Sequence, residues 1–196
     1  MRAVVQHGPE DLRLDELPVP EPAPGQVLVR VRDNGICGSD LHSWRHALFG
    51  TGVVLGHEIA GEVAALGEGV SGLSVGEIGA VYAGDTCGSC DLCSAGLSYY
   101  CQNGHGLGTG GGLGGLAEYL AVPAASFLPV SPGTDLAPVT FAEPLANGLR
   151  CLDRPEVSEA SSARCSWRDA RSAARRRSSS APSARSTRPR RTWPPS

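Results

Sequence analysis

The chain has 196 residues, and 41% of them are hydrophobic, which is enough for an ordinary folded core. It carries 17 basic residues against 20 acidic ones, for a formal net charge of -3, and no stretch approaches the about 20 apolar residues of a membrane span. The first residues also lack the apolar run of a secretory signal, so we expect a cytoplasmic protein that contacts no membrane.

The charge is divided unevenly along the chain. Residues 1–149 hold 5 arginines and 16 acidic residues, whereas residues 150–196 hold 12 arginines and 4 acidic residues. Two parts that differ this much in charge do not look like one folded unit. We therefore expect a domain boundary near residue 157, with a domain over residues 1–157 and a separate segment over residues 158–196.

Short strand-like stretches separated by Gly and Pro turns run through the first part of the chain. They cover residues 2–6, 12–17, 26–32, 59–66, 80–83 and 116–122. Helices are predicted over residues 39–46, with Ser39 or Asp40 as the N-cap, and over residues 141–152, where Pro144 fits a first turn. Short strands with frequent turn signals predict a mostly β (α+β) domain with antiparallel pairing.

Cysteine and histidine residues form two patterns that are typical of zinc ligands. His57 follows Cys37 by twenty residues and is itself followed by Glu58. Four further cysteines have the spacing C-x2-C-x2-C-x7-C, at Cys87, Cys90, Cys93 and Cys101. An all-sulfur zinc site is usually structural, whereas a mixed Cys, His and carboxylate site with an open position is usually catalytic. The alternatives are a redox or disulfide cluster for the four cysteines and a small buried apolar side chain for Cys37.

A glycine-rich run at residues 106–111 matches the dinucleotide pattern G-x-G-x-x-G. No clear strand precedes this run, and more glycines follow where a helix should begin. We therefore interpret it as a loop that leads into the strand at residues 116–122, and not as a phosphate-binding turn.

Taken together, these motifs resemble the medium-chain alcohol dehydrogenases. Residues 56–61 (GHEIAG), followed after five residues by residues 67–70 (GEGV), match the zinc signature of that family. The sequence CGSDLH at residues 37–42 lies before this signature, and the four-cysteine lobe and AEPLA at residues 142–146 lie after it, in the order that the family uses. The resemblance implies a GroES-like catalytic domain with a structural zinc lobe. Glu58 after His57, and the Glu-Pro-Leu motif, are similar to the polyol and diol branch, which includes sorbitol, idonate and butanediol dehydrogenases.

The resemblance also implies a ligand set for two zinc ions per chain. Cys37 and His57 would bind the catalytic zinc, and either Glu58 or Glu143 would complete the protein ligands. The four cysteines of the lobe would bind the structural zinc. We expect both carboxylates to lie within reach of the zinc, and the resemblance to the diol branch slightly favours Glu143 as the ligand.

Three further residues receive roles from the same resemblance. Ser39 is similar to the hydroxyl that accepts the substrate proton, and His42 is placed like the onward relay to solvent. Asp40 resembles the carboxylate that orients the zinc-binding histidine. For all three, the alternative is an ordinary structural role.

The activity that the resemblance implies is oxidation of a secondary alcohol, polyol or diol, with NAD or NADP as the hydride acceptor. Zinc would act as a Lewis acid that lowers the pKa of the bound alcohol. The substrate would be a small molecule, and members of the family associate as homo-oligomers.

The resemblance ends after Val157, where the family continues into a Rossmann domain that binds the nicotinamide cofactor. Residues 158–196 are instead rich in Arg, Ser, Ala and Pro, and such a segment cannot bury enough apolar surface to fold. We expect a disordered tail and no Rossmann domain in this chain, and we hypothesise that a slip of the reading frame near residues 158–164 produces the tail. A chain of this kind should have little or no dehydrogenase activity.

The alternative function is a non-catalytic zinc-binding module whose basic tail binds nucleic acid or an acidic partner. The tail lacks regularly spaced aromatic residues among its arginines. We therefore expect a truncated dehydrogenase and not a nucleic-acid-binding protein.

Overall fold

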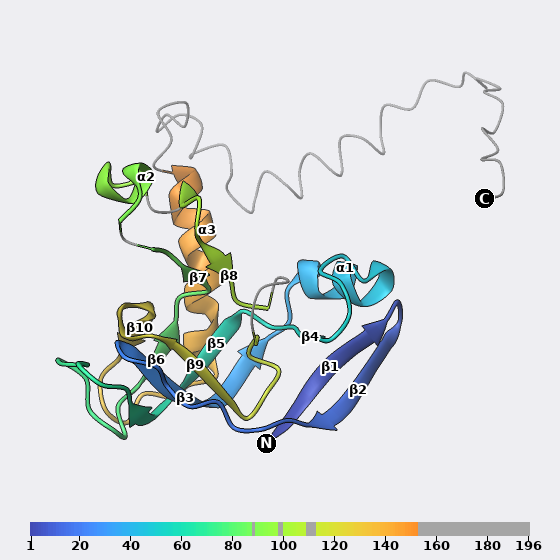
Figure 1. Cartoon of the computed structure of the whole chain (residues 1–196), viewed down its shortest axis with the longest axis horizontal. Coiled ribbons are helices and arrows are strands. Elements are labelled where there is room, and N and C mark those ends of the chain that lie inside the picture. The colour runs from blue at the N-terminus through green and yellow to red at the C-terminus, as the bar shows by residue number, and fades with distance from the viewer. Residues whose placement is uncertain (88, 98–99, 109–112, 153–196) are drawn as a thin grey trace, which may run out of the picture. The chain divides into compact units, whose positions relative to one another are not determined.

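The computed structural model describes residues 1–152 except residues 88, 98–99 and 109–112 (Figure 1). Contacts divide the chain into two units, Met1–Gly148 and Leu149–Ser196. The first unit holds nearly all of the described elements. Residues 158–196, for which we predicted a disordered tail and a slip of the reading frame, lie outside the described residues. That tail and the predicted boundary at residue 157 therefore stay predictions.

The largest sheet of the first unit has five strands in the order β10-β6-β5-β3-β9. The strands are β3 Gln26–Gly35, β5 Glu58–Leu66, β6 Ile78–Val81, β9 Tyr119–Pro123 and β10 Phe127–Pro129. Each pairing in this sheet is antiparallel. The prediction of a mostly β domain with antiparallel pairing is confirmed.

The core of this sheet is built from cross-strand pairs of branched apolar residues. Val27 lies opposite Val122 and Val29 lies opposite Leu120 in the pairing of β3 with β9, and all four side chains are fully buried. Burial of one such side chain contributes about 1.5–3 kcal/mol to folding. These pairs fix the position of β3, whose last residues lead directly to Cys37.

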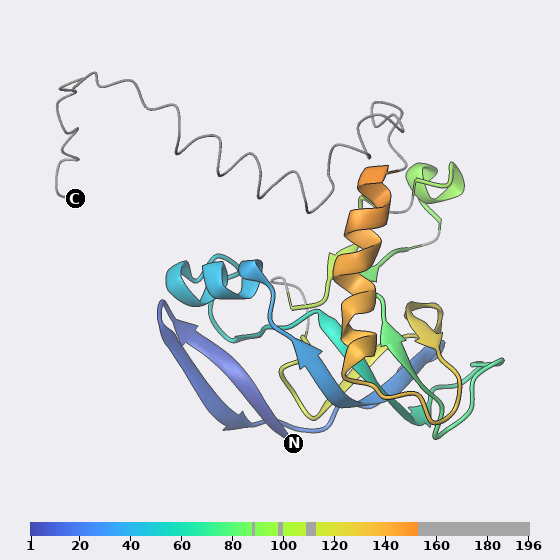
Figure 2. The ribbon, with the colours of Figure 1, turned by 180° about the vertical axis from the view of Figure 1, so that it is seen from behind.

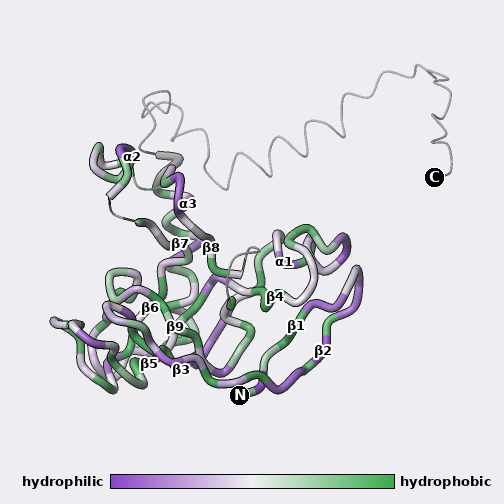
Figure 3. The backbone as a smooth tube through the Cα atoms, viewed as in Figure 1, coloured by the Kyte–Doolittle hydropathy of each residue, from purple (hydrophilic) through white to green (hydrophobic). Residues whose placement is uncertain are grey.

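A second sheet has three strands in the order β2-β1-β4. They are β1 Arg2–Gly8, β2 Asp11–Glu16 and β4 Val53–Val54. Ala3, Val5 and Val54 form a small core beneath it. Polar and apolar residues alternate along the edge strand β2, as can be followed in Figure 3, but Leu12 and Leu14 are both exposed, so this strand adds little to the core.

Helix α1, Gly38–His46, is attached to β1 by buried polar contacts. Ser43 Oγ donates to Gln6 Oε1 at 2.7 Å, and Gln6 Nε2 donates to the Ser43 carbonyl at 2.5 Å, with both side chains fully buried. The backbone N–H of Glu10 donates to the Trp44 carbonyl at 2.5 Å. In both ribbon views α1 therefore lies beside the turn of the β1–β2 hairpin (Figure 1, Figure 2).

The remaining described elements are short, apart from one helix. The strands β7 Gly84–Asp85 and β8 His105–Gly106 pair with each other, and α2 Asp91–Ser94 lies between them in the sequence. The last elements are the 3-10 helices η2 Ala124–Ser126 and η3 Pro138–Phe141, followed by α3 Ala142–Leu152. In the described part of the chain, no helix combines the length and apolar character that crossing a membrane requires. The glycine-rich run begins in β8 and continues into residues outside the described ones.

Candidate metal centres

Cys37, His57 and Glu58 form a mixed cluster in which one donor atom from each side chain lies within 4.8 Å of the others. Cys37 directly precedes α1, and His57 and Glu58 lie where the chain enters β5. Cys37 and Glu58 are partly buried, and His57 is 9% exposed. The structure thus brings together a thiol, an imidazole and a carboxylate, which is the donor set of a mixed zinc site.

Gly56 shapes the turn that brings His57 into the cluster. Its φ is +96°, in the left-handed region that favours glycine. The Gly56 carbonyl accepts a hydrogen bond from the N–H of Gly115 at 2.8 Å, and the Leu55 carbonyl accepts one from Leu116 at 2.9 Å. A side chain at position 56 would come within 2.9 Å of the Leu116 nitrogen, so this close backbone crossing requires glycine.

Asp40 joins the two segments that supply the cluster. It is 4% exposed, its Oδ2 accepts the Cys37 N–H at 2.9 Å, and its Oδ1 accepts the Gly56 N–H at 3.2 Å. Asp40 Oδ1 also lies 3.6 Å from His57 Nδ1. Because Nδ1 faces Asp40, Nε2 is the ring nitrogen that remains for a metal. The position of Asp40 fits the predicted orienting role, which stays a prediction.

The charges of the cluster influence one another. The contact with Asp40 raises the pKa of His57 to about 9, against the opposing effect of burial, and Cys37 adds to the increase. Hydrogen bonds from the Ser39 hydroxyl and backbone N–H lower the pKa of the Cys37 thiol. Burial alone would raise the pKa of Asp40, but its contacts with His57, Cys37 and Gly56 outweigh burial and lower it. The thiol and the carboxyl group are thus biased toward the charged forms.

The two residues predicted to move protons both belong to α1. Ser39 lies next to the cluster, because its hydroxyl hydrogen-bonds to the Cys37 sulfur. His42 is exposed, and its ring makes an edge-to-face contact with His46 at a centroid distance of 5.6 Å. These positions do not test a role in proton transfer, so both roles stay predictions.

Glu143 does not belong to the mixed cluster in the part of the chain that the structure describes. It belongs to the first turn of α3, and its Oε1 accepts a hydrogen bond from Asn147 Nδ2 at 2.7 Å. Among the described residues, the group that could hold a metal with Cys37 and His57 contains Glu58 and not Glu143. The choice between Glu58 and Glu143 as the third zinc ligand stays a prediction.

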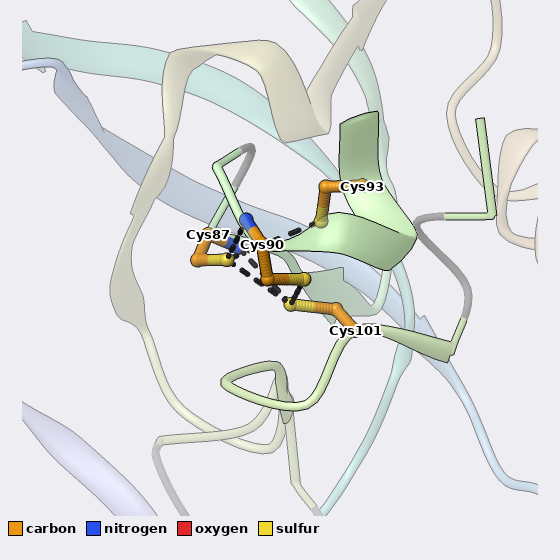
Figure 4. Close-up of side chains that lie close together, drawn as sticks. All are labelled: Cys87, Cys90, Cys93 and Cys101. Carbon is orange, nitrogen blue, oxygen red and sulfur yellow. Dashed lines mark hydrogen bonds between the residues drawn. The ribbon is translucent and has the colours of Figure 1, made fainter. Parts of the chain in front are cut away.

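The four cysteines of the lobe form a second cluster (Figure 4). The Sγ–Sγ distances are 3.5 Å for Cys87 and Cys101, 3.9 Å for Cys90 and Cys101, and 4.0 Å for Cys87 and Cys93. Zinc–sulfur bonds of about 2.3 Å in a tetrahedron place neighbouring sulfurs about 3.8 Å apart. These three distances are close to that value, and all four Sγ atoms lie within 4.8 Å of one another, so the cluster could hold a zinc ion.

The environment of this lobe also favours thiolates. Hydrogen bonds from the backbone N–H groups of Ser89 and Cys90 lower the pKa of the Cys87 thiol to about 5. Asn103 Nδ2 donates to Cys87 Sγ at 3.6 Å. No sequence pattern pointed to Asn103, although its position two residues after Cys101 could have done so. Thiolates are the form that binds zinc, so the lobe is prepared for a metal.

Comparison with known proteins identifies the family of the chain. Residues 23–132 match the family described as the alcohol dehydrogenase GroES-like domain. L-threonine 3-dehydrogenase of Stenotrophomonas maltophilia is 33% identical over 157 residues, which cover 77% of this chain and 46% of that enzyme. The chain thus spans about half the length of the curated relatives it matches.

Solved structures show the same likeness. A short chain alcohol dehydrogenase (rspB) from Escherichia coli CFT073, complexed with NADH, is 34% identical with a TM-score of 0.72, over 78% of this chain and 44% of that one. Galactitol-1-phosphate dehydrogenase from Escherichia coli is 29% identical with a TM-score of 0.72, over 76% of this chain and 43% of that one.

Proposed function

The chain belongs to the medium-chain alcohol dehydrogenase family through its GroES-like domain, and we propose that it supplies the zinc-binding part of an enzyme that oxidises an alcohol with NAD or NADP. The observation that carries this proposal is the mixed cluster. A purely structural role would require only the four-cysteine lobe, whereas Cys37, His57 and Glu58 form a second donor set. Three protein ligands with an open fourth position are typical of catalytic zinc.

Each residue in and around the mixed cluster has a separate proposed role in binding zinc or in moving the substrate proton. Cys37 and His57 would hold the zinc ion with Glu58, and Asp40 would keep the His57 ring turned so that Nε2 faces the metal. Zinc, when bound, supplies a Lewis acid that stabilises negative charge on an alcohol oxygen. We propose that Ser39, which contacts the Cys37 thiol, takes the hydroxyl proton of a substrate. We propose that His42, exposed on the next turn of α1, passes that proton to solvent.

The substrate class is proposed from the relatives. Threonine carries its secondary hydroxyl next to a carbon that bears an amine, and galactitol 1-phosphate is a polyol in which each CH–OH has an oxygen-bearing neighbour. Both therefore have a heteroatom on the carbon beside a secondary alcohol. We propose that this chain acts on a secondary alcohol of that kind, which includes polyols and diols.

The nicotinamide cofactor needs residues beyond those of the described sheets. Among the described residues, the paired strands of each sheet run antiparallel, whereas the family binds its dinucleotide on a parallel sheet. We propose that a polypeptide of these 196 residues alone gives little or no turnover, because hydride transfer requires the nicotinamide close to the substrate carbon. Turnover at rates typical of enzymes would contradict this. Homo-oligomer formation by a complete family member stays a prediction.

Metal analysis of the purified chain tests the proposed function. We expect two zinc ions per chain, one of which is lost in Cys37→Ser and the other in Cys101→Ser. With Co²⁺ in the mixed site, an alcohol with a neighbouring hydroxyl or amine should change the visible spectrum at lower concentration than a simple primary alcohol. A single zinc ion, held only by the four cysteines, would contradict the proposal. That result would favour the alternative function, a zinc-binding module with a basic tail. The residues of the tail lie outside those that the structure describes.

A further inference from the structure

The end of β3 and the beginning of β5 form the base of the mixed cluster. Their antiparallel register places Asn34 opposite Ile59 and Gly35 opposite Glu58. Gly35 is thus the direct cross-strand neighbour of a proposed zinc ligand, two residues before Cys37. The sequence pattern gave no role to either Asn34 or Gly35.

Glu58 occupies the space that a side chain at position 35 would need. A Cβ atom on Gly35 would lie well inside van der Waals contact with Glu58 Oε2, and 3.0 Å and 3.1 Å from Glu58 Cβ and Cδ. The three nearest atoms that such a Cβ would meet all belong to the Glu58 side chain. The Glu58 carboxylate therefore lies against the Gly35 backbone in the conformation in which it also meets Cys37 and His57.

The constraint on Gly35 comes from space and not from backbone conformation. Gly35 is not among the residues with positive φ. Alanine could therefore adopt the same backbone, and the three nearest atoms that its Cβ would meet all belong to the Glu58 side chain. A substitution at this position should move Glu58 and leave the fold intact.

Asn34 holds the other side of the same base. Its Nδ2 donates to the Gly35 carbonyl at 2.5 Å, and its amide group packs against Gly56 so closely that a Cβ there would be 2.8 Å from Nδ2 and 3.0 Å from Oδ1. Its Oδ1 is buried and also fills the space beside Gly115. Asn34 thus links Gly35 to the turn that carries His57.

We propose that Gly35 and Asn34 are positioning residues that direct the carboxylate of Glu58 to the metal. Gly35 leaves the space through which Glu58 reaches Cys37 and His57, and Asn34 holds Gly35 and Gly56 at the separation that this requires. Glu58, and not Glu143, is then the carboxylate that completes the mixed site. This inference rests on the proposed function, because it needs a metal at that site.

The test is a double-mutant cycle on metal affinity. Zn²⁺ and Co²⁺ are titrated against a competing chelator into the 196-residue chain and its variants, and the four-cysteine site of each molecule serves as the internal reference. Gly35→Ala should weaken binding at the mixed site by about 10- to 100-fold, as expected for loss of a residue that orients a ligand, and should change the visible spectrum of Co²⁺ there. In a Glu58→Gln background, Gly35→Ala should change the affinity less than about twofold, because both substitutions act through the same carboxylate.

Gly38→Ala is the matched control. Gly38 lies three residues further on, directly after Cys37, and a Cβ there would meet no atom within 4 Å. The Gly38→Ala variant should bind metal at both sites with the affinity of the wild type. Circular dichroism and thermal unfolding of each variant distinguish a displaced Glu58 ligand from an unfolded protein. A Gly35→Ser variant, for which we expect the same loss of metal affinity at the mixed site, provides a second readout.

Three results would overturn this inference while leaving the proposed function intact. The first is an unchanged mixed-site affinity in Gly35→Ala. The second is an equal loss from Gly35→Ala with and without Glu58→Gln, which would show that position 35 acts through another group. The third is loss of the mixed-site metal in Glu143→Gln and not in Glu58→Gln. If the wild-type mixed site binds no metal, the proposed function itself is wrong.

Discussion

Asp40→Asn is the substitution that most directly tests how the mixed cluster is held together. The Asp40 carboxylate is 4% exposed and accepts two backbone hydrogen bonds, from Cys37 at 2.9 Å and from Gly56 at 3.2 Å. An asparagine has the same shape but only one acceptor oxygen, so its NH2 group would face one of these two N–H donors. A buried N–H without an acceptor costs about 1–3 kcal/mol, and we expect a destabilisation of about 2 kcal/mol.

The loss of charge has a second effect, which stability alone would not show. The contact with Asp40 is the largest cause of the raised pKa of His57, about 9 in the metal-free protein. In the folded state the protonated ring is therefore favoured below this pKa, and removal of the negative charge should move the pKa of His57 back toward its ordinary value of about 6.5.

Urea unfolding and NMR titration of the imidazole measure these two effects in the metal-free protein. Asp135→Asn is a suitable control, because Asp135 is exposed and its Oδ1 accepts only one hydrogen bond, from the Ala137 N–H at 3.3 Å. Its free energy of unfolding should change by less than about 0.5 kcal/mol. The reasoning would be refuted if Asp40→Asn unfolded at the same urea concentration as the wild type and the pKa of His57 stayed near 9.

Three further predictions concern the two metal centres and the support of α1. Zinc binds neutral imidazole, and His57, with a pKa of about 9, must lose a proton to bind it. Zinc affinity at the mixed site should therefore increase about tenfold for each pH unit from acidic pH up to pH 9. An affinity independent of pH between 6 and 8 would contradict this. Cys101→Ser should remove one zinc ion and leave the Co²⁺ spectrum of the mixed site unchanged, whereas loss of both metals would show that the centres depend on each other. Gln6→Leu leaves the buried Ser43 hydroxyl without its acceptor and leaves the Ser43 carbonyl with the Ala47 N–H as its remaining donor, so denaturant unfolding should show a loss of about 1–3 kcal/mol, and an unchanged stability would contradict the role given to this contact.

The sequence predicted the long elements well, because their patterns are local. The predicted strands and helices correspond to β1, β2, β3, β5, β6, β9, α1 and α3. The described strands without a sequence signal are β4, β7, β8 and β10, which have two or three residues each. Such strands are too short for a period of two to appear, and their pairing depends on residues far away in the chain.

The site residues also divide into those that local sequence motifs predict and those that depend on contacts between distant parts of the chain. Spacing and family resemblance pointed to Cys37 and His57, and the structure brings these residues together. They could not decide between Glu58 and Glu143, because that choice depends on where β5 and α3 lie in space. Gly35 was missed for a related reason, since the predicted strand ended at residue 32 whereas β3 continues to Gly35.

The pairing of β3 with β5 contains two irregularities. Val29 lies opposite Val63 and Val31 opposite Gly61, but Asp33 lies opposite Ala60, so β3 contains one extra residue at Arg32. A shift of the opposite sense between Leu28 and Val29 gives β5 an extra residue at Ala64, and the two shifts compensate. Bulges of this kind re-aim side chains and occur often beside functional sites.

The bulge at Arg32 decides which residue meets Glu58. If the register of Val31 with Gly61 continued without interruption, Asn34 and not Gly35 would lie opposite Glu58. An asparagine side chain there would take the space that the Glu58 carboxylate now uses, and the mixed cluster would lose its carboxylate. Deletion of Arg32 should therefore weaken metal binding at the mixed site, although the Arg32 side chain forms its ion pair at the surface, with Glu62 at 3.6 Å, and Glu62 is not one of the proposed ligands. Arg32→Ala, which keeps the extra residue, should bind metal as the wild type does, because the site depends on the register of the two strands and not on the arginine side chain.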